Sequence, residues 1–137
     1  MAEMTEQEKN YLVLSALETI RLYQYMPFNL RYFKPPSLSI TLETLYSDYF
    51  KEGYLHIVQS ICAVEIGAGT PQIKIGINDR GTKLIFTSGT PAAAENSVDY
   101  IGQLLVPGGC RIFADFEGAT ATDTAYLYIN GYRIRFK

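Results

Sequence analysis

From Tyr54 to the C-terminus, apolar and polar residues alternate with a period of two, and this alternation constrains the fold more than any other feature of the chain. Turn-forming residues interrupt it every eight to twelve residues or so, as in a β-sandwich or barrel. Successive side chains of a strand point to opposite faces of its sheet, so the pattern predicts short, half-buried strands. We therefore expect a mainly β protein with an antiparallel, jelly-roll-like β-sandwich over residues 54–137.

Six or seven antiparallel strands are expected in this region. They cover Tyr54 to Ile66, Gln72 to Ile77, Lys83 to Thr87, Val98 to Leu105, Cys110 to Glu117, Ala125 to Ile129 and Tyr132 to Phe136. Asn78-Asp79-Arg80-Gly81 predicts one hairpin, and Asn130-Gly131, a preferred pair for a type I′ turn, predicts the last one.

The strand over 110–117 shows how faces can be assigned from the alternation. Ile112, Ala114 and Phe116 take one face, whereas Arg111, Phe113, Asp115 and Glu117 take the other. We expect Asp115 or Glu117 to lie opposite Arg133 or Arg135 on a neighbouring strand, as an ordinary cross-strand ion pair.

The first 52 residues differ from the rest because all eleven glycines of the chain fall from Gly53 onward. Thr5 and Glu8 fit a capping box, and the apolar spacing that follows predicts a helix from about Glu6 to about Tyr23. A competing interpretation is a strand, because apolar residues also alternate there and aromatic content rises toward Tyr25.

A second helix is predicted from Thr41 as N-cap to Gly53 at the C′ position. Its apolar side chains recur at the spacing of one helical face, namely Leu42, Leu45, Tyr46, Tyr49 and Phe50.

Between the two predicted helices, Pro27 and Pro35-Pro36 favour an extended arm over Met26 to Ile40. Five aromatic residues lie in or just before this arm, and they are our candidate interface residues: Tyr23, Tyr25, Phe28, Tyr32 and Phe33. Their rings could pack on the sandwich of the same chain or bury area against another chain, where Tyr and Phe are enriched. The chain thus divides into residues 1–53, with helices and aromatic arm, and residues 54–137, the sandwich.

The composition excludes several classes of function. With 137 residues, 47% of them hydrophobic and 19% charged, the chain has the composition of one compact domain. Fourteen acidic against twelve basic residues give a net charge of −2, which argues against a nucleic-acid partner. No uncharged run approaches the roughly 18 to 20 residues of a membrane span, and the acidic start differs from a signal peptide. We expect a soluble intracellular protein without a membrane partner.

No set of catalytic or metal-binding residues stands out. His56 is the only histidine, and inside a predicted strand it is expected to be a packing residue. Cys62 and Cys110 lack CxxC spacing, so we expect neither a zinc site nor a redox motif, and the sequence leaves open whether they form a disulfide. The chain is therefore predicted to be no enzyme and to need no cofactor or metal.

Three acidic residues, Asp115, Glu117 and Asp123, lie near one predicted turn. A calcium site or a pair of glycosidase carboxylates is conceivable there, but the spacing matches no calcium loop. A solvated strand face that ends in a turn explains the same residues, and we favour that interpretation.

One segment carries a resemblance to a known group of proteins. Residues 109–132, GCRIFADFEGATATDTAYLYINGY, resemble the closing strands of small β-sandwich proteins in tailed-phage virions, in particular capsid decoration or cement proteins. The resemblance covers residues 54–137 at most. It implies a non-enzymatic virion component assembled in the host cytoplasm, often a trimer on a capsid lattice, with a terminal segment that contacts neighbouring subunits.

Two functions follow as hypotheses. The first is a structural protein that cements or decorates a phage particle through itself and other virion proteins. The second is a binding module of a phage neck, tail or adhesin that recognises a glycan or a cell-surface ligand. Rings of Phe113, Tyr126 and Tyr128 lining a groove would favour the second, and burial of the arm aromatics against another chain would favour the first.

Overall fold

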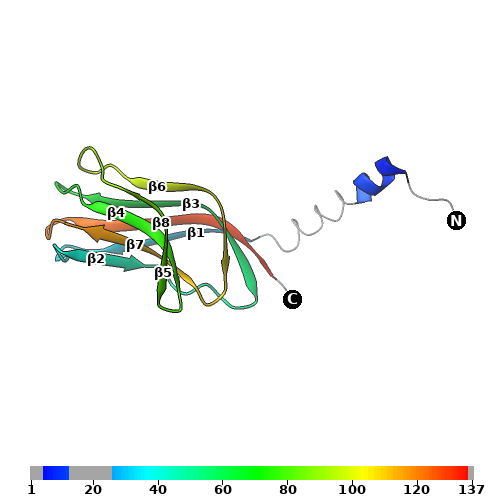
Figure 1. Cartoon of the computed structure of the whole chain (residues 1–137), viewed down its shortest axis with the longest axis horizontal. Coiled ribbons are helices and arrows are strands. Elements are labelled where there is room, and N and C mark those ends of the chain that lie inside the picture. Colours follow the sequence, from blue (N-terminus) through cyan, green and yellow to red (C-terminus); the bar gives the residue numbers. More distant parts are fainter. Residues whose placement is uncertain (1–4, 13–25, 136–137) are drawn as a thin grey trace.

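The chain forms a β-sandwich, as the alternation predicts (Figure 1). The computed structural model describes residues 5–12 and 26–135. Its strands are β1 (Met26–Lys34), β2 (Leu42–Tyr46), β3 (Tyr54–Ile66), β4 (Gln72–Asp79), β5 (Thr82–Gly89), β6 (Val98–Pro107), β7 (Arg111–Glu117) and β8 (Thr124–Arg135). Among the described residues, no helix is long and apolar enough to cross a membrane.

The strands form two four-stranded sheets whose paired strands are antiparallel. One sheet has the order β1-β8-β3-β6 and the other the order β2-β7-β4-β5. The only neighbours in these sheets that are also consecutive in the chain are β4 and β5, joined at the predicted Asn78-Gly81 turn, where the Gly81 N–H donates to Asn78 Oδ1 over 2.9 Å. All the other pairings join strands distant in sequence.

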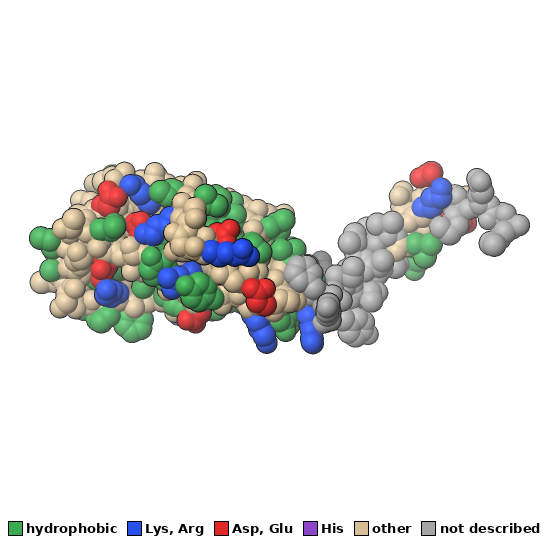
Figure 2. Space-filling model, turned by 60° about the horizontal axis from the view of Figure 1, so that its bottom comes forward, with side chains coloured by type: hydrophobic (Ala, Val, Ile, Leu, Met, Phe, Trp, Pro, Cys, Tyr) green, Lys and Arg blue, Asp and Glu red, His purple; other side chains and the backbone are tan. Residues whose placement is uncertain are grey.

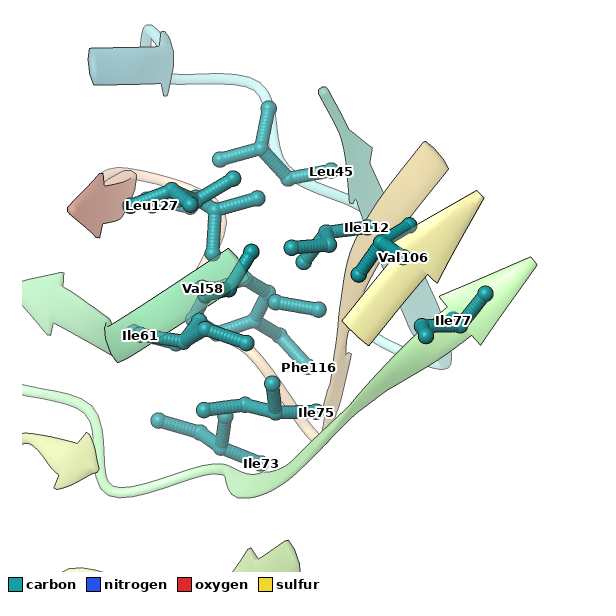
Figure 3. Packing of buried hydrophobic residues seen from close by; sticks show 14 of the residues in the cluster. Leu45, Val58, Ile61, Ile73, Ile75, Ile77, Val106, Ile112, Phe116 and Leu127 are labelled. Atoms are coloured by element: carbon teal, nitrogen blue, oxygen red, sulfur yellow. The ribbon is translucent and has the colours of Figure 1, made fainter. Parts of the chain in front are cut away.

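The core lies between the two sheets, where inward-facing side chains of both layers meet (Figure 3). Ile73, Ile75 and Phe116 come from one sheet, and Val58 and Leu127 come from the other. All five are fully or almost fully removed from solvent. Burying such a side chain contributes roughly 1.5–3 kcal/mol, so this layer is the main source of stability.

The predicted capping box is present at the start of the chain. The Glu8 N–H donates to Thr5 Oγ1 over 3.2 Å, and the Thr5 N–H donates to Glu8 Oε2 over 3.4 Å. Residues 6–12 are helical. The rest of the predicted helix, up to Tyr23, lies outside the described residues.

The helix predicted from Thr41 to Gly53 is wrong, because this stretch forms strand β2 and a loop. Strand β2 pairs with β7 through Leu45 opposite Ala114, and inward-facing Leu45 is buried. Leu42 and Tyr49, which a helix would bury on the same face, are exposed. Pairing with a distant strand thus overrides the local helical spacing.

The segment predicted as an extended arm is also part of the sandwich. Its residues Met26–Lys34 form edge strand β1, which pairs with β8 from Met26 opposite Arg133 to Lys34 opposite Ala125. Strands β1 and β2 both precede the boundary expected at residue 53, and each belongs to one of the two sheets.

The predicted C-terminal hairpin is wrong as well, because β8 runs through Asn130-Gly131 as one continuous strand. A type I′ turn needs positive φ at both central residues, but neither Asn130 nor Gly131 is among the residues with positive φ. Gly131 instead lies between Val58 of β3 and Phe28 of β1. A Cβ at this position would approach the Phe28 ring and the Val58 Cα to 3.0 Å.

We therefore expect Gly131→Ala to destabilise the fold by ~2 kcal/mol or more, because the added methyl would overpack three strands. Urea unfolding measures the change. The matched control is Gly89→Ala in β5, where a Cβ would have its nearest neighbour at 3.4 Å, an ordinary contact. Equal stability of the two variants would contradict the continuous strand.

Candidate interaction surfaces

The predicted site residues lie in separate parts of the fold. His56 lies in β3 with its side chain buried at one end of the sandwich. Its ring stacks on Phe50, with centroids 4.5 Å apart and planes at 20°. Burial, and secondly the positive charge of Arg133, lowers the pKa of His56, so the imidazole is neutral at pH 7.

A small cavity of about 160 Å³ opens beside His56. It is lined mainly by aromatic rings, with Asp48, Lys51 and Arg133 also contributing. No Ser, Thr or Cys lies among the described residues that line it, and the hydroxyl groups at the cavity belong to Tyr32 and Tyr49.

Neither cysteine has the properties of a reactive thiol. Cys62 and Cys110 are both free in the structure, which answers the question of a disulfide. Burial, with a further contribution from Asp99, raises the pKa of Cys62 to about 11, and burial likewise raises the pKa of Cys110. The thiolate is the reactive form, so these shifts disfavour nucleophilic chemistry at neutral pH.

The three acidic residues that the sequence placed near one turn are separated in the fold. Asp115 accepts a hydrogen bond from Thr44 Oγ1 over 2.6 Å and forms an ion pair with Lys83 at 3.0 Å. Glu117 pairs with Lys74 at 2.9 Å. The cross-strand pairs expected with Arg133 or Arg135 are wrong, because β7 and β8 belong to different sheets.

These ion pairs lie on the outer face of the β2-β7-β4-β5 sheet, and this face is covered by its own side chains. Phe113 is fully buried there, with Lys83 Nζ 4.9 Å from the ring centroid. The Arg111 guanidinium lies 3.7 Å from the Tyr46 ring centroid. Phe113 is therefore not an exposed platform for a sugar.

The outer face of the other sheet carries an aromatic stripe, which we define as Phe33, Tyr126 and Tyr128. Phe33 of β1 lies directly opposite Tyr126 of β8, with ring centroids 6.3 Å apart. Tyr126 and Tyr128 stack with planes 3° from parallel at 5.9 Å. Both tyrosines are half-buried and Phe33 is exposed.

The five arm aromatics thus have different roles. Phe28 and Tyr32 pack against the core between the sheets, so their rings serve the fold of the same chain. Phe33 points outward and joins the aromatic stripe. Tyr23 and Tyr25 lie outside the described residues.

A group of exposed apolar side chains lies on the two edge strands β5 and β6, and we call it the β5–β6 flank. Its residues and exposed fractions are Leu84 51%, Ile85 52%, Phe86 41%, Ile101 84% and Leu105 60%. The two strands belong to different sheets but touch, with the Phe86 and Tyr100 ring centroids 6.2 Å apart. Exposed hydrophobic side chains are also visible among charged ones in Figure 2.

Strand β5 differs from an ordinary edge strand because successive apolar side chains on both of its faces are exposed. It hydrogen-bonds to β4 on one side only. An open edge with exposed apolar residues is a template for pairing with another chain. The alternation in the sequence does not predict this flank, although the uninterrupted run Leu84-Ile85-Phe86 breaks the alternation and could have signalled it.

In the described parts of the chain, no group of three or more His, Cys, Asp or Glu side chains is placed to hold a metal ion.

No protein-family model matches the sequence, and no curated protein matches it.

Solved structures with a similar arrangement of strands belong to proteins of different kinds. The nucleoplasmin-like N-terminal domain of Drosophila FKBP39 is 16% identical, with 82% of this chain and 91% of that chain covered and a TM-score of 0.44. A cyanophage Pam1 capsid chain is 16% identical over 81% and 84%, with a TM-score of 0.42. The family 32 carbohydrate-binding module of C. perfringens NanJ, solved with galactose, is 11% identical over 79% and 98%, with a TM-score of 0.41. Similarities at this level assign no function to the chain.

We expect His56→Gln to flatten the pH dependence of stability without abolishing biological function. The pKa of His56 is lowered in the fold, so its stabilising contribution is present above the unfolded pKa of about 6.5 and is lost as pH falls below it. Urea unfolding between pH 7.5 and 5 measures this, with Arg133, Lys51 and Asp48 as the other charged groups at the cavity. Loss of function in a well-folded variant would contradict the non-enzymatic interpretation.

Proposed function

We propose that this chain is a non-enzymatic structural protein of a tailed-phage virion, of the capsid decoration or cement type, which associates with other protein chains. The observation that carries the association is the β5–β6 flank, with five large apolar side chains exposed at an open sheet edge. The resemblance of residues 109–132 to small virion sandwiches supports the phage context.

The contrast between the surfaces supports the flank as the contact region. On the outer face of the β2-β7-β4-β5 sheet, the basic and acidic side chains neutralise one another within the chain. The flank has no such cover, and apolar surface left in water is unfavourable by ~25 cal/mol per Å². A second protein surface, either another copy or a capsid subunit, would remove that cost. A homotrimer on the capsid lattice is the arrangement that we propose.

The test places a charge in the flank. We expect Ile85→Lys and Ile101→Lys each to weaken self-association or capsid binding at least tenfold, because truncating or charging an interface hot spot costs ~2 kcal/mol or more. Analytical ultracentrifugation measures self-association, and co-sedimentation with capsids that lack this protein measures particle binding.

The matched control is Ile40→Lys, since Ile40 is also exposed but lies in a loop away from the flank. Full association by both flank variants would refute the flank as the interface. A second variant, which lacks residues 1–25, tests whether the segment with Tyr23 and Tyr25 contacts neighbouring subunits. This deletion leaves strand β1 intact. Unchanged assembly of that variant would remove Tyr23 and Tyr25 from the interface.

One observation favours the second function, recognition of a glycan. The aromatic stripe offers Phe33 and two parallel tyrosine rings on an outer sheet face, and sugars bind to such aromatic surfaces through apolar contact and nearby polar groups. If this function holds, Tyr126→Ala abolishes binding on a glycan array, whereas Ile85→Lys leaves it unchanged.

A further inference from the structure

Four carboxylates are buried in the described part of the chain, and two of them lack a basic partner. Glu43 forms an ion pair with Lys34 at 2.6 Å, and Asp115 forms one with Lys83. Glu65 and Asp123, only 2% and 5% exposed, form no ion pair with a Lys or Arg in the described residues. Instead, the two acidic residues are close enough for each charge to act on the other.

The fold brings Glu65 and Asp123 together at one end of the sandwich. Glu65 is the penultimate residue of β3 and lies opposite Ala125 of β8, whose side chain faces the core. Asp123 directly precedes β8, in the loop that follows β7. The loop after β3 closes over both, because the Ala68 and Gly69 N–H groups donate to the two oxygens of Asp123 over 3.2 and 2.8 Å.

One oxygen of this group has no partner. Glu65 Oε1 accepts a hydrogen bond from the Thr120 N–H over 2.8 Å. Glu65 Oε2 is completely buried and makes no hydrogen bond to any of the described residues. A buried carboxylate oxygen without donor or cation is unfavourable, and buried charges in proteins are paired or coordinate metals.

Gly69 shows that further oxygens converge on Glu65 Oε2. A Cβ added at Gly69 would lie 2.5 Å from Glu65 Oε2, 2.5 Å from Thr120 Oγ1 and 2.9 Å from Asp123 Oδ2. Two carboxylates and a hydroxyl therefore lie close together against the backbone of Gly69, which carries no side chain that would displace them.

The electrostatics of the group point the same way. Burial raises the pKa of Glu65; the Thr120 amide lowers it, and the negative charge of Asp123 raises it again. Two buried carboxyl groups lie side by side without a basic partner among the described residues. A divalent cation would compensate them and bind the free Oε2 atom.

We propose that Glu65, Asp123 and Thr120 bind a calcium ion that joins the loop after β3 to the loop before β8. The donors are all oxygens, without His or Cys, which favours a hard cation over zinc or copper. Calcium takes six to eight oxygens in flexible geometry, so the proposed site needs further oxygens besides those of these three side chains. This site is independent of the β5–β6 flank and of the proposed virion function.

The test compares the thermal unfolding of the full chain in 5 mM calcium chloride, in 5 mM magnesium chloride and in EGTA. We expect calcium to raise the midpoint by about 5 °C or more relative to EGTA, and magnesium to raise it much less. Isothermal titration with calcium should give one site per chain. Glu65→Gln should remove both effects, and in EGTA it should unfold at a higher temperature than the wild type, because it no longer buries an unpaired acid.

Two controls separate calcium binding from general damage to the fold. Asp115→Asn removes a buried carboxylate that already has a basic partner, so its calcium response should equal that of the wild type. Gly69→Ala, which places a methyl among the three oxygens, should lose the response, whereas Gly89→Ala should keep it. A wild-type midpoint that is the same within 1 °C in calcium and EGTA, with no heat of binding, would overturn the proposal and leave a carboxyl pair that shares a proton.

Discussion

The long pairing of β3 with β8 is the contact on which the rest of the structure depends. These two strands run side by side from Tyr54 opposite Arg135 to Ile66 opposite Thr124, at the centre of one sheet. Their inward-facing side chains supply much of that sheet's half of the core, including Val58, Ile61, Ala63, Leu127 and Ile129. The edge strands β1 and β6 pair with them, and the second sheet packs on the surface that they form.

The same pairing determines what lies at the two ends of the sandwich. At one end, β3 presents His56 beside Arg133 of β8, and both residues line the small cavity there. At the other end, β3 presents Glu65 beside the loop that leads into β8, where Asp123 holds the neighbouring loop through two amide donors. Both polar groups face inward for the same reason as the apolar core residues, because alternation along β3 directs them there.

The outer face of the β2-β7-β4-β5 sheet and its edge at β5 differ in how far their side chains are paired or covered by the same chain. Lysines and acidic residues on the β2-β7-β4-β5 sheet pair with each other and cover Phe113, so their charges are compensated within the chain. Strand β5 at its edge keeps apolar side chains exposed on both faces, next to exposed residues of β6. Association with another chain would cover these exposed apolar side chains and pair the open edge, and this is the physical basis of the proposed structural role.

Local patterns in the sequence determined the sandwich class, the capping box of Thr5 and Glu8 and the β4–β5 hairpin, because alternation and turn residues act over a few neighbours. Only the tertiary structure decided that residues 42–46 form a strand, that β8 continues through Asn130-Gly131, and that Phe28 and Tyr32 belong to the core. In each case a distant strand offered hydrogen bonds and buried area that outweighed the local preference. The run Leu84-Ile85-Phe86 could signal exposed apolar residues, but their exposure depends on the position of β5 at the edge of its sheet. Glu65 and Asp123 come together only because β3 pairs with β8, the strand that Asp123 precedes.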